Sequence, residues 1–141
     1  SLRFPGKFDV IYNVEEDMLT CEMLKFILQP LMENAMEHGV IPCKKRGRIE
    51  VTGKISSDHI AEISICDNGN GISDETLQTL HQELKKDLQQ GVNHSSSGIG
   101  LINVHQRIKN YYGEEFGISV ESNQGEYTCV KVCFPVLREE V

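Results

Sequence analysis

The chain has 141 residues, of which 39% are hydrophobic and 25% charged, and its formal net charge is −7. This length and composition are typical of one soluble globular domain with a sizeable core, and we expect one domain over 1–141. The negative charge argues against a general nucleic-acid surface, because such binding depends on neutralising phosphates. No apolar run approaches the ~20 residues of a membrane span. The five cysteines include no Cys-x-x-Cys pair, and we expect buried free thiols.

The first half of the chain predicts a strand, a helix and a hairpin. Apolar and polar residues alternate over 7–14, which is typical of a strand. Apolar residues recur at helical spacing over 20–38, and Pro30 inside this run predicts a kink or two abutting helices. The runs 48–56 and 60–66 then predict a β-hairpin.

The second half predicts two more helices and a closing hairpin. Ser73 is expected to cap a helix that continues to about residue 90, and a polar loop follows it. A last helix is predicted over 100–112, and a hairpin is predicted from 118–122 and 128–134. Hairpins mixed with helices indicate an α+β fold, in which helices cover one face of a mixed, mostly antiparallel sheet.

Two polar residues share strand parity with apolar neighbours. Asp67 has the parity of Ile63 and Ile65, so its carboxylate is expected to point toward the core, where it needs hydrogen-bond donors. The alternative is that the strand ends at Cys66 and Asp67 caps a turn. Thr128 is expected to face inward as well, although a single inward threonine is usually satisfied by the backbone.

Two further features suit a magnesium–phosphate ligand. Asn34 lies on the apolar stripe of the long helix, where it either belongs to a structural network or offers an oxygen to a hard cation such as Mg²⁺. The run Ser-Ser-Ser-Gly-Ile-Gly-Leu at 95–101 feeds a helix start, where exposed amides and the helix dipole favour phosphate. A single Gly-x-Gly is weak evidence by itself.

Four segments in order resemble the ATP-binding catalytic domain of sensor histidine kinases, in the LytS/YesM-type branch of the GHKL superfamily. They are LQPLMENAMEHG at 28–39, DNGNGI at 67–72, SSSGIGLINVHQRIKNYYG at 95–113 and GEYTCVKVCFP at 125–135. The resemblance covers essentially the whole chain. It implies a two-layer α/β sandwich of the Bergerat type that holds ATP and Mg²⁺ under a lid of roughly residues 73–97.

The resemblance also implies roles for individual residues. Asp67 would accept a hydrogen bond from the adenine amino group, Thr128 would support adenine through water, and Asn34 would ligate Mg²⁺. Glu33 and Asn34 are the candidate catalytic residues. The residues implied in nucleotide binding are Asn34, Glu37, His38, Asp67, Gly69, Gly71, Ile72, Ser97, Gly98, Ile99, Gly100, Leu101 and Thr128.

The chain departs from the broad kinase pattern at several positions. Pro30 replaces a common asparagine, as it does throughout this branch, and Glu37 replaces a common lysine near the phosphates. His38 and Arg107 are candidates to compensate for that lost cation. Tyr127 stands where the branch often has glycine, which would change the wall of the adenine site.

The resemblance implies that the chain donates the γ-phosphoryl group to a histidine on a separate dimerisation hairpin, which this chain lacks. We read His81, within HQELKK, as a surface residue rather than a phosphoacceptor, and expect His105 to be solvent-facing or packed. The implied partners are ATP, that hairpin and a response regulator, with no nucleic acid and no membrane contact by this chain. The full-length protein is expected to be a homodimeric, membrane-anchored sensor, of which this is a monomeric cytoplasmic portion. The alternatives are a GHKL ATPase or serine kinase of another branch, and a non-catalytic nucleotide sensor.

Overall fold

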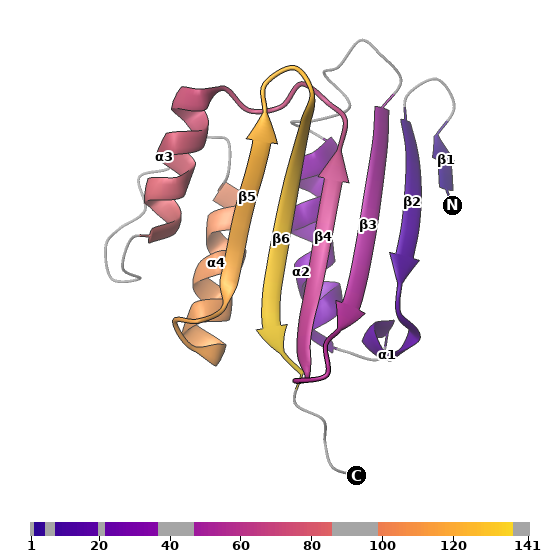
Figure 1. Cartoon of the computed structure of the whole chain (residues 1–141), viewed down its shortest axis with the longest axis vertical. Helices are drawn as coiled ribbons and strands as arrows, with labels where there is room; N and C mark the ends of the chain where they lie inside the picture. Colours follow the sequence, from indigo (N-terminus) through magenta and orange to yellow (C-terminus); the bar gives the residue numbers. More distant parts are fainter. Residues whose placement is uncertain (1, 5–7, 20–21, 37–46, 86–98, 137–141) are drawn as a thin grey trace.

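A computed structural model of the chain describes residues 2–4, 8–19, 22–36, 47–85 and 99–136 (Figure 1). The strands are β1 (Leu2–Phe4), β2 (Phe8–Val14), β3 (Gly47–Ile55), β4 (Ile60–Asp67), β5 (Gly117–Asn123) and β6 (Tyr127–Pro135). The helices are α1 (Glu16–Leu19), α2 (Glu22–Asn34), α3 (Asp74–Lys85) and α4 (Ile99–Tyr112). Among the described residues, none of these helices combines the length and apolar character that a membrane crossing requires.

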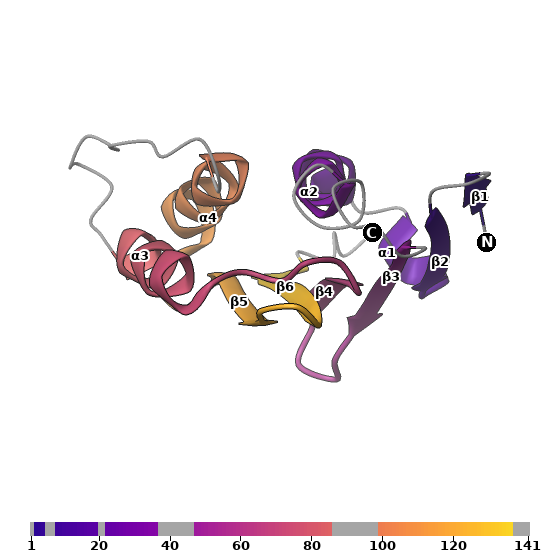
Figure 2. The same cartoon turned by 90° about the horizontal axis from the view of Figure 1, so that it is seen from above.

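The six strands form one sheet in the order β1-β2-β3-β4-β6-β5. Only β2 and β3 are parallel, and every other neighbouring pair is antiparallel. Figure 2 shows α2 and α4 side by side over one face of this sheet, with α3 beside β5. The α+β prediction is therefore confirmed. Because α2 continues through Pro30 as one helix, the alternative of two abutting helices is wrong.

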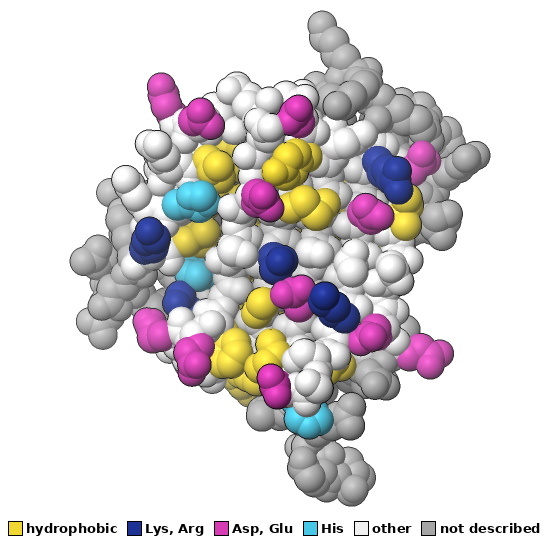
Figure 3. All heavy atoms as spheres, viewed as in Figure 1, with side chains coloured by type: hydrophobic (Ala, Val, Ile, Leu, Met, Phe, Trp, Pro, Cys, Tyr) yellow, Lys and Arg dark blue, Asp and Glu magenta, His cyan; other side chains and the backbone are white. Residues whose placement is uncertain are grey.

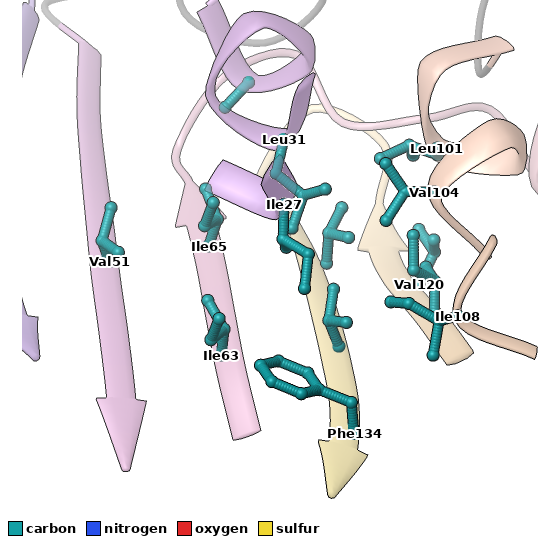
Figure 4. Close-up of a cluster of buried hydrophobic side chains, with 14 of the residues drawn as sticks. Ile27, Leu31, Val51, Ile63, Ile65, Leu101, Val104, Ile108, Val120 and Phe134 are labelled. Carbon is teal, nitrogen blue, oxygen red and sulfur yellow. The ribbon is translucent and has the colours of Figure 1, made fainter. Parts of the chain in front are cut away.

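The core lies between the sheet and the helical layer. Burial alternates residue by residue along β4, so its inward side chains meet the apolar faces of the helices. Figure 4 shows Ile63 and Ile65 of β4 near Ile27 and Leu31 of α2. The β5 side of the same core is filled from α4, whose apolar residues Leu101, Val104 and Ile108 lie near Val120 in Figure 4. The helices are thus held on the sheet by ordinary hydrophobic burial.

The opposite face of the sheet is open and carries mixed charges (Figure 3). On it Lys54 of β3 approaches Glu62 of β4 to 3.8 Å. The same face contains a disulfide between Cys66 of β4 and Cys129 of β6, whose Cα atoms are 4.0 Å apart and directly opposite in the ladder. The expectation of five free thiols is therefore wrong for this pair. Strand pairing brings together two cysteines that are 63 residues apart, and no local spacing reveals that.

Two histidines fasten the helices to β5. His105 of α4 is buried, and its Nε2 lies 2.6 Å from the backbone oxygen of Leu84 at the end of α3. Its Nδ1 accepts a hydrogen bond of 2.8 Å from the N–H of Ile118. His81 of α3 is partly exposed, and its Nε2 lies 3.0 Å from the oxygen of Val120, so this surface residue also contacts β5.

Candidate nucleotide site

The predicted nucleotide-binding segments meet at one end of the sheet. β6 is antiparallel to both β4 and β5, so β4 and β5 point the same way. β5 follows α4 in the chain and runs back in the opposite direction beside it. The start of α4 therefore lies at the end of the sheet where β4 and β5 finish (Figure 1). The end of α2 lies at the same end of the sheet, which brings Asn34, Asp67 and Ile99 to one region.

Asp67 is the last residue of β4 and points into the molecule. Its side chain is only 4% exposed, and its Oδ1 accepts a hydrogen bond of 2.8 Å from the N–H of Gly69. Burial raises the pKa of Asp67 from 3.8 to about 6, while the hydrogen bond from Gly69 opposes the rise. The parity prediction is confirmed, because the strand includes Asp67 instead of ending at Cys66. The carboxylate also accepts a hydrogen bond from the turn residue Gly69, as the turn-capping alternative expected, but its side chain is buried.

The second carboxylate oxygen of Asp67 has no hydrogen-bond partner among the described residues. No fully buried side-chain polar atom in the described part of the chain lacks a partner. Among the described residues, Gly69 is thus the one hydrogen-bond partner of this carboxylate. An inward carboxylate is an acceptor that a donor group of a ligand can pair with.

The loop after Asp67 is anchored on both sides. The N–H of Arg48 in β3 donates to Asn68 Oδ1 at 2.6 Å, and Asn68 returns a bond from its N–H to the oxygen of Arg48 at 3.1 Å. On the other side, the N–H of Gly125 in the β5–β6 turn donates to the oxygen of Asn70 at 2.6 Å. The loop is thus fixed between β3 and the final hairpin.

Gly71 is required by packing within the protein. Its φ is +72°, which disfavours any residue with a Cβ, and an added Cβ would lie 2.8 Å from the Cα of Gln124 and even closer to the oxygen of Asn123. The resemblance assigns Gly71 to close approach of the nucleotide. The structure adds a second reason for glycine, because the β5–β6 turn presses on the same spot.

A serine that the sequence reasoning missed connects this loop to Thr128. Ser122 of β5 accepts a hydrogen bond from the N–H of Ile72 at 2.8 Å and donates one to the oxygen of Tyr127 at 2.7 Å. Its Oγ also lies 2.9 Å from Thr128 Oγ1. Thr128 is directly opposite both Ser122 and Asp67, so the three form one inward row across β4, β6 and β5. The parity of Ser122 with Ile118 and Val120 was the signal that could have found it.

Asn34 ends α2, and its side chain is half-buried. The neighbouring Glu33 is exposed and accepts a 3.4 Å hydrogen bond from Gln29 one turn earlier. The predicted contacts of Glu37 and His38 lie outside the described residues. Of the two predicted catalytic residues on this helix, Asn34, which is also the predicted metal ligand, is therefore the one that is partly buried.

The start of α4 is free of acidic side chains in its first turn, unlike that of α3, which carries Asp74 and Glu75. An anion can approach such a helix start without charge repulsion. The backbones of Ile99 and Gly100 open the helix, whereas the side chain of Leu101 is buried in the core. The predictions for Ser97 and Gly98 lie outside the described residues.

Two other predictions are not supported by the geometry. The side chain of Tyr127 points to the open face, where its hydroxyl donates to Glu121 at 3.3 Å, so it does not form a wall of the inward site. The guanidinium of Arg107 lies 4.2 Å from the ring centre of Phe26. That position is eight residues, or about 12 Å of helix, from Ile99. Arg107 therefore links α4 to α2 instead of replacing the missing phosphate cation.

Comparison with known proteins agrees with this geometry. The family described as histidine kinase-, DNA gyrase B-, and HSP90-like ATPase matches residues 21–138. The chain belongs to this ATPase family. The catalytic domain of histidine kinase ThkA has the same fold, with a TM-score of 0.65 at 16% identity, and the match covers 92% of this chain and 80% of that domain.

Relatives of this histidine kinase-like ATPase domain include larger sensor proteins. Sensor histidine kinase YpdA of Escherichia coli is 32% identical over 112 residues, which cover 79% of this chain and 18% of YpdA. Sensor histidine kinase/phosphatase LytS of Staphylococcus aureus is 30% identical over 141 residues, which cover 98% of this chain and 22% of LytS. The resemblance to the LytS-type branch is thus confirmed, and the chain spans about a fifth of each relative.

Proposed function

We propose that this ATPase-family chain binds Mg-ATP at the end of the sheet where β4 finishes, and donates the γ-phosphoryl group to a histidine on a separate domain. The observation that carries the proposal is the buried, inward carboxylate of Asp67, whose Oδ1 is held by the N–H of Gly69. An acceptor in this position can pair with a donor of the ligand, and the amino group of adenine is such a donor. Thr128 lies opposite Asp67 and supports the same edge of the base.

The residues present fit magnesium-bound phosphates. Asn34 offers one amide oxygen, and the described residues contain no cluster of three or more His, Cys, Asp or Glu that could form a dedicated metal cage. One protein ligand suits Mg²⁺, which takes most of its other ligands from phosphate oxygens and water. When bound, the ion would neutralise phosphate charge. The backbone N–H groups at the start of α4, preceded by Ser97 and Gly98, would hold the phosphates.

Transfer from such a site is mainly a matter of position. The protein has to hold the γ-phosphate in line with the acceptor nitrogen and stabilise the spreading charge. Glu33, beside Asn34, is exposed, and its proposed role is to orient water at the site, the alternative being that it simply faces solvent. The segment 73–97 would act as the lid, of which the first half is the packed helix α3.

The acceptor histidine would belong to a dimerising helical hairpin of the same or a partner kinase. A response regulator would then take the phosphoryl group. The larger size of YpdA and LytS supports this arrangement, since it leaves room for such domains. We place the reaction in the cytoplasm, where ATP is available, as part of a membrane-anchored dimeric sensor.

The test is a calorimetric titration of the chain with Mg-ATP, followed by addition of a purified hairpin domain and γ-labelled ATP. We expect the chain to bind, Asp67→Asn to lose binding while it stays folded, and label to appear as acid-labile phosphohistidine. Asp58→Asn is the matched control, because Asp58 is exposed in the β3–β4 turn. Absence of binding by the folded chain would refute the proposal. Binding without transfer would favour the nucleotide-sensor alternative.

A further inference from the structure

The hydroxyl group of Ser122 has three hydrogen-bond partners within 3 Å. They are the N–H of Ile72 at 2.8 Å, the backbone oxygen of Tyr127 at 2.7 Å and Thr128 Oγ1 at 2.9 Å. A serine hydroxyl has one proton to donate and two lone pairs that accept. Three contacts therefore use its whole capacity, and this fixes the direction of each bond.

The identity of the partners leaves one assignment that satisfies all of them. A backbone carbonyl only accepts, so the proton of Ser122 is directed to the oxygen of Tyr127. A backbone N–H only donates, so Ile72 occupies one lone pair of Ser122. Thr128 must then donate its own proton into the second lone pair. Both hydroxyl groups are oriented by the backbone around them.

This assignment decides what Thr128 offers to the site. Its only proton points to Ser122, so toward a ligand its Oγ1 can act only as an acceptor. Across the β4–β6 ladder lies Asp67, whose ionised carboxylate also only accepts. The inward row formed by Asp67 and Thr128 is consequently an edge of acceptors with no donor of its own.

We propose that Ser122 is a specificity-determining positioning residue, which keeps the base-binding edge acceptor-only by taking the proton of Thr128. The inference rests on the proposed binding of a nucleotide at Asp67 and deepens it. Such an edge favours a purine that presents an amino group, as adenine does. At the position of the amino group it disfavours a carbonyl oxygen, because two acceptors would face each other without a proton.

The test compares ATP with ITP, in which a carbonyl oxygen replaces the 6-amino group and N1 carries a proton that adenine lacks. Calorimetric Kd values for both Mg-nucleotides are measured on the unaltered chain and on Ser122→Ala. In the variant the Thr128 hydroxyl is free to rotate and donate to the carbonyl oxygen of ITP, so we expect the ratio of Kd for ITP to Kd for ATP to fall roughly 5-fold, the size of one net hydrogen bond. Weakened anchoring of Ile72 would lower both affinities together and leave the ratio unchanged.

Two controls make the result specific. Ser119→Ala removes the same group from the same strand on its exposed face, and we expect the ratio to stay as in the unaltered chain. Ser122→Thr retains a hydroxyl group at the same position and should restore the ratio. A folded Ser122→Ala chain whose ratio stays within about twofold of the unaltered value overturns the inference.

If Ser122→Ala does not fold, Thr128→Val decides the question, because it removes the oriented acceptor and keeps the side-chain shape. We expect the ratio to fall in that variant too, and an unchanged ratio would overturn the inference. The failure of the two proposals can be told apart. If the unaltered, folded chain binds neither nucleotide, the proposed function fails. If it binds ATP but the variants keep its preference, only the role of Ser122 fails.

Discussion

Replacing Asp67 by asparagine is expected to stabilise the nucleotide-free chain at pH 8. Burial raises the pKa of this carboxyl from 3.8 to about 6, so folding at pH 8 includes the cost of burying a charge. At 1.36 kcal/mol per pKa unit, that cost is about 3 kcal/mol. Asparagine carries no charge, and its Oδ1 can still accept the hydrogen bond from Gly69. The free energy of unfolding should therefore rise by up to ~3 kcal/mol.

The stability difference between Asp67→Asn and the wild-type chain should depend on pH in a definite direction. The folded-state pKa of Asp67 lies above the unfolded-state value, so the folded chain binds more protons between pH 3.8 and about 6. The wild-type chain is free of the burial cost below that window and bears all of it above the window. The advantage of Asp67→Asn should thus be full at pH 8, shrink as the pH falls below 6 and disappear near pH 4.

Urea unfolding of both chains at pH 8, 6 and 4.5 measures this difference. Taking the difference between the two chains cancels the other groups that titrate in the same range. Asp58→Asn, in an exposed turn, should give little difference at any of these pH values. An Asp67→Asn chain that is less stable than wild type at pH 8, or a difference that does not change with pH, would refute the reasoning.

Three further outcomes follow from single contacts. Gly71→Ala should lower the free energy of unfolding by at least ~1 kcal/mol more than Gly125→Ala. Both glycines have a positive φ, but only at Gly71 would the added Cβ meet backbone atoms. Equal shifts of the urea midpoint in the two variants would contradict this. Burial lowers the pKa of His105, which also feels the charges of Lys109 and Glu114, so the stability of the folded chain should fall as the pH drops below 6.5. In thermal melts at pH 7 and 5, the melting temperature of His105→Gln should fall less than that of the unaltered chain. Reducing Cys66–Cys129 with dithiothreitol should lower the free energy of unfolding by up to ~4 kcal/mol, since it opens a long loop, and an unchanged urea midpoint would argue against the disulfide.

Strand parity and helical spacing predicted most of the fold because these patterns are local. The alternation of Ile63, Ile65 and Asp67 placed the carboxylate inward, and the structure confirms that position. The same rule would have placed Ser122 inward and Tyr127 outward, so both were within reach of the sequence. The order of the strands was not, because the sequence does not state which edge β5 occupies or that β2 and β3 run parallel.

The sequence by itself determined the class of fold, the inward position of Asp67 and the four segments that resemble the histidine kinase family. These depend on residue order and on the periods of strand and helix. Only the tertiary structure decided which groups meet: the pairing of Cys66 with Cys129, the double anchoring of His105, and the direction of the proton on Thr128. Each of these depends on contacts between segments that are distant in sequence or on adjacent strands in register. Hydrogen-bond direction is a property of the assembled network, and no single residue specifies it.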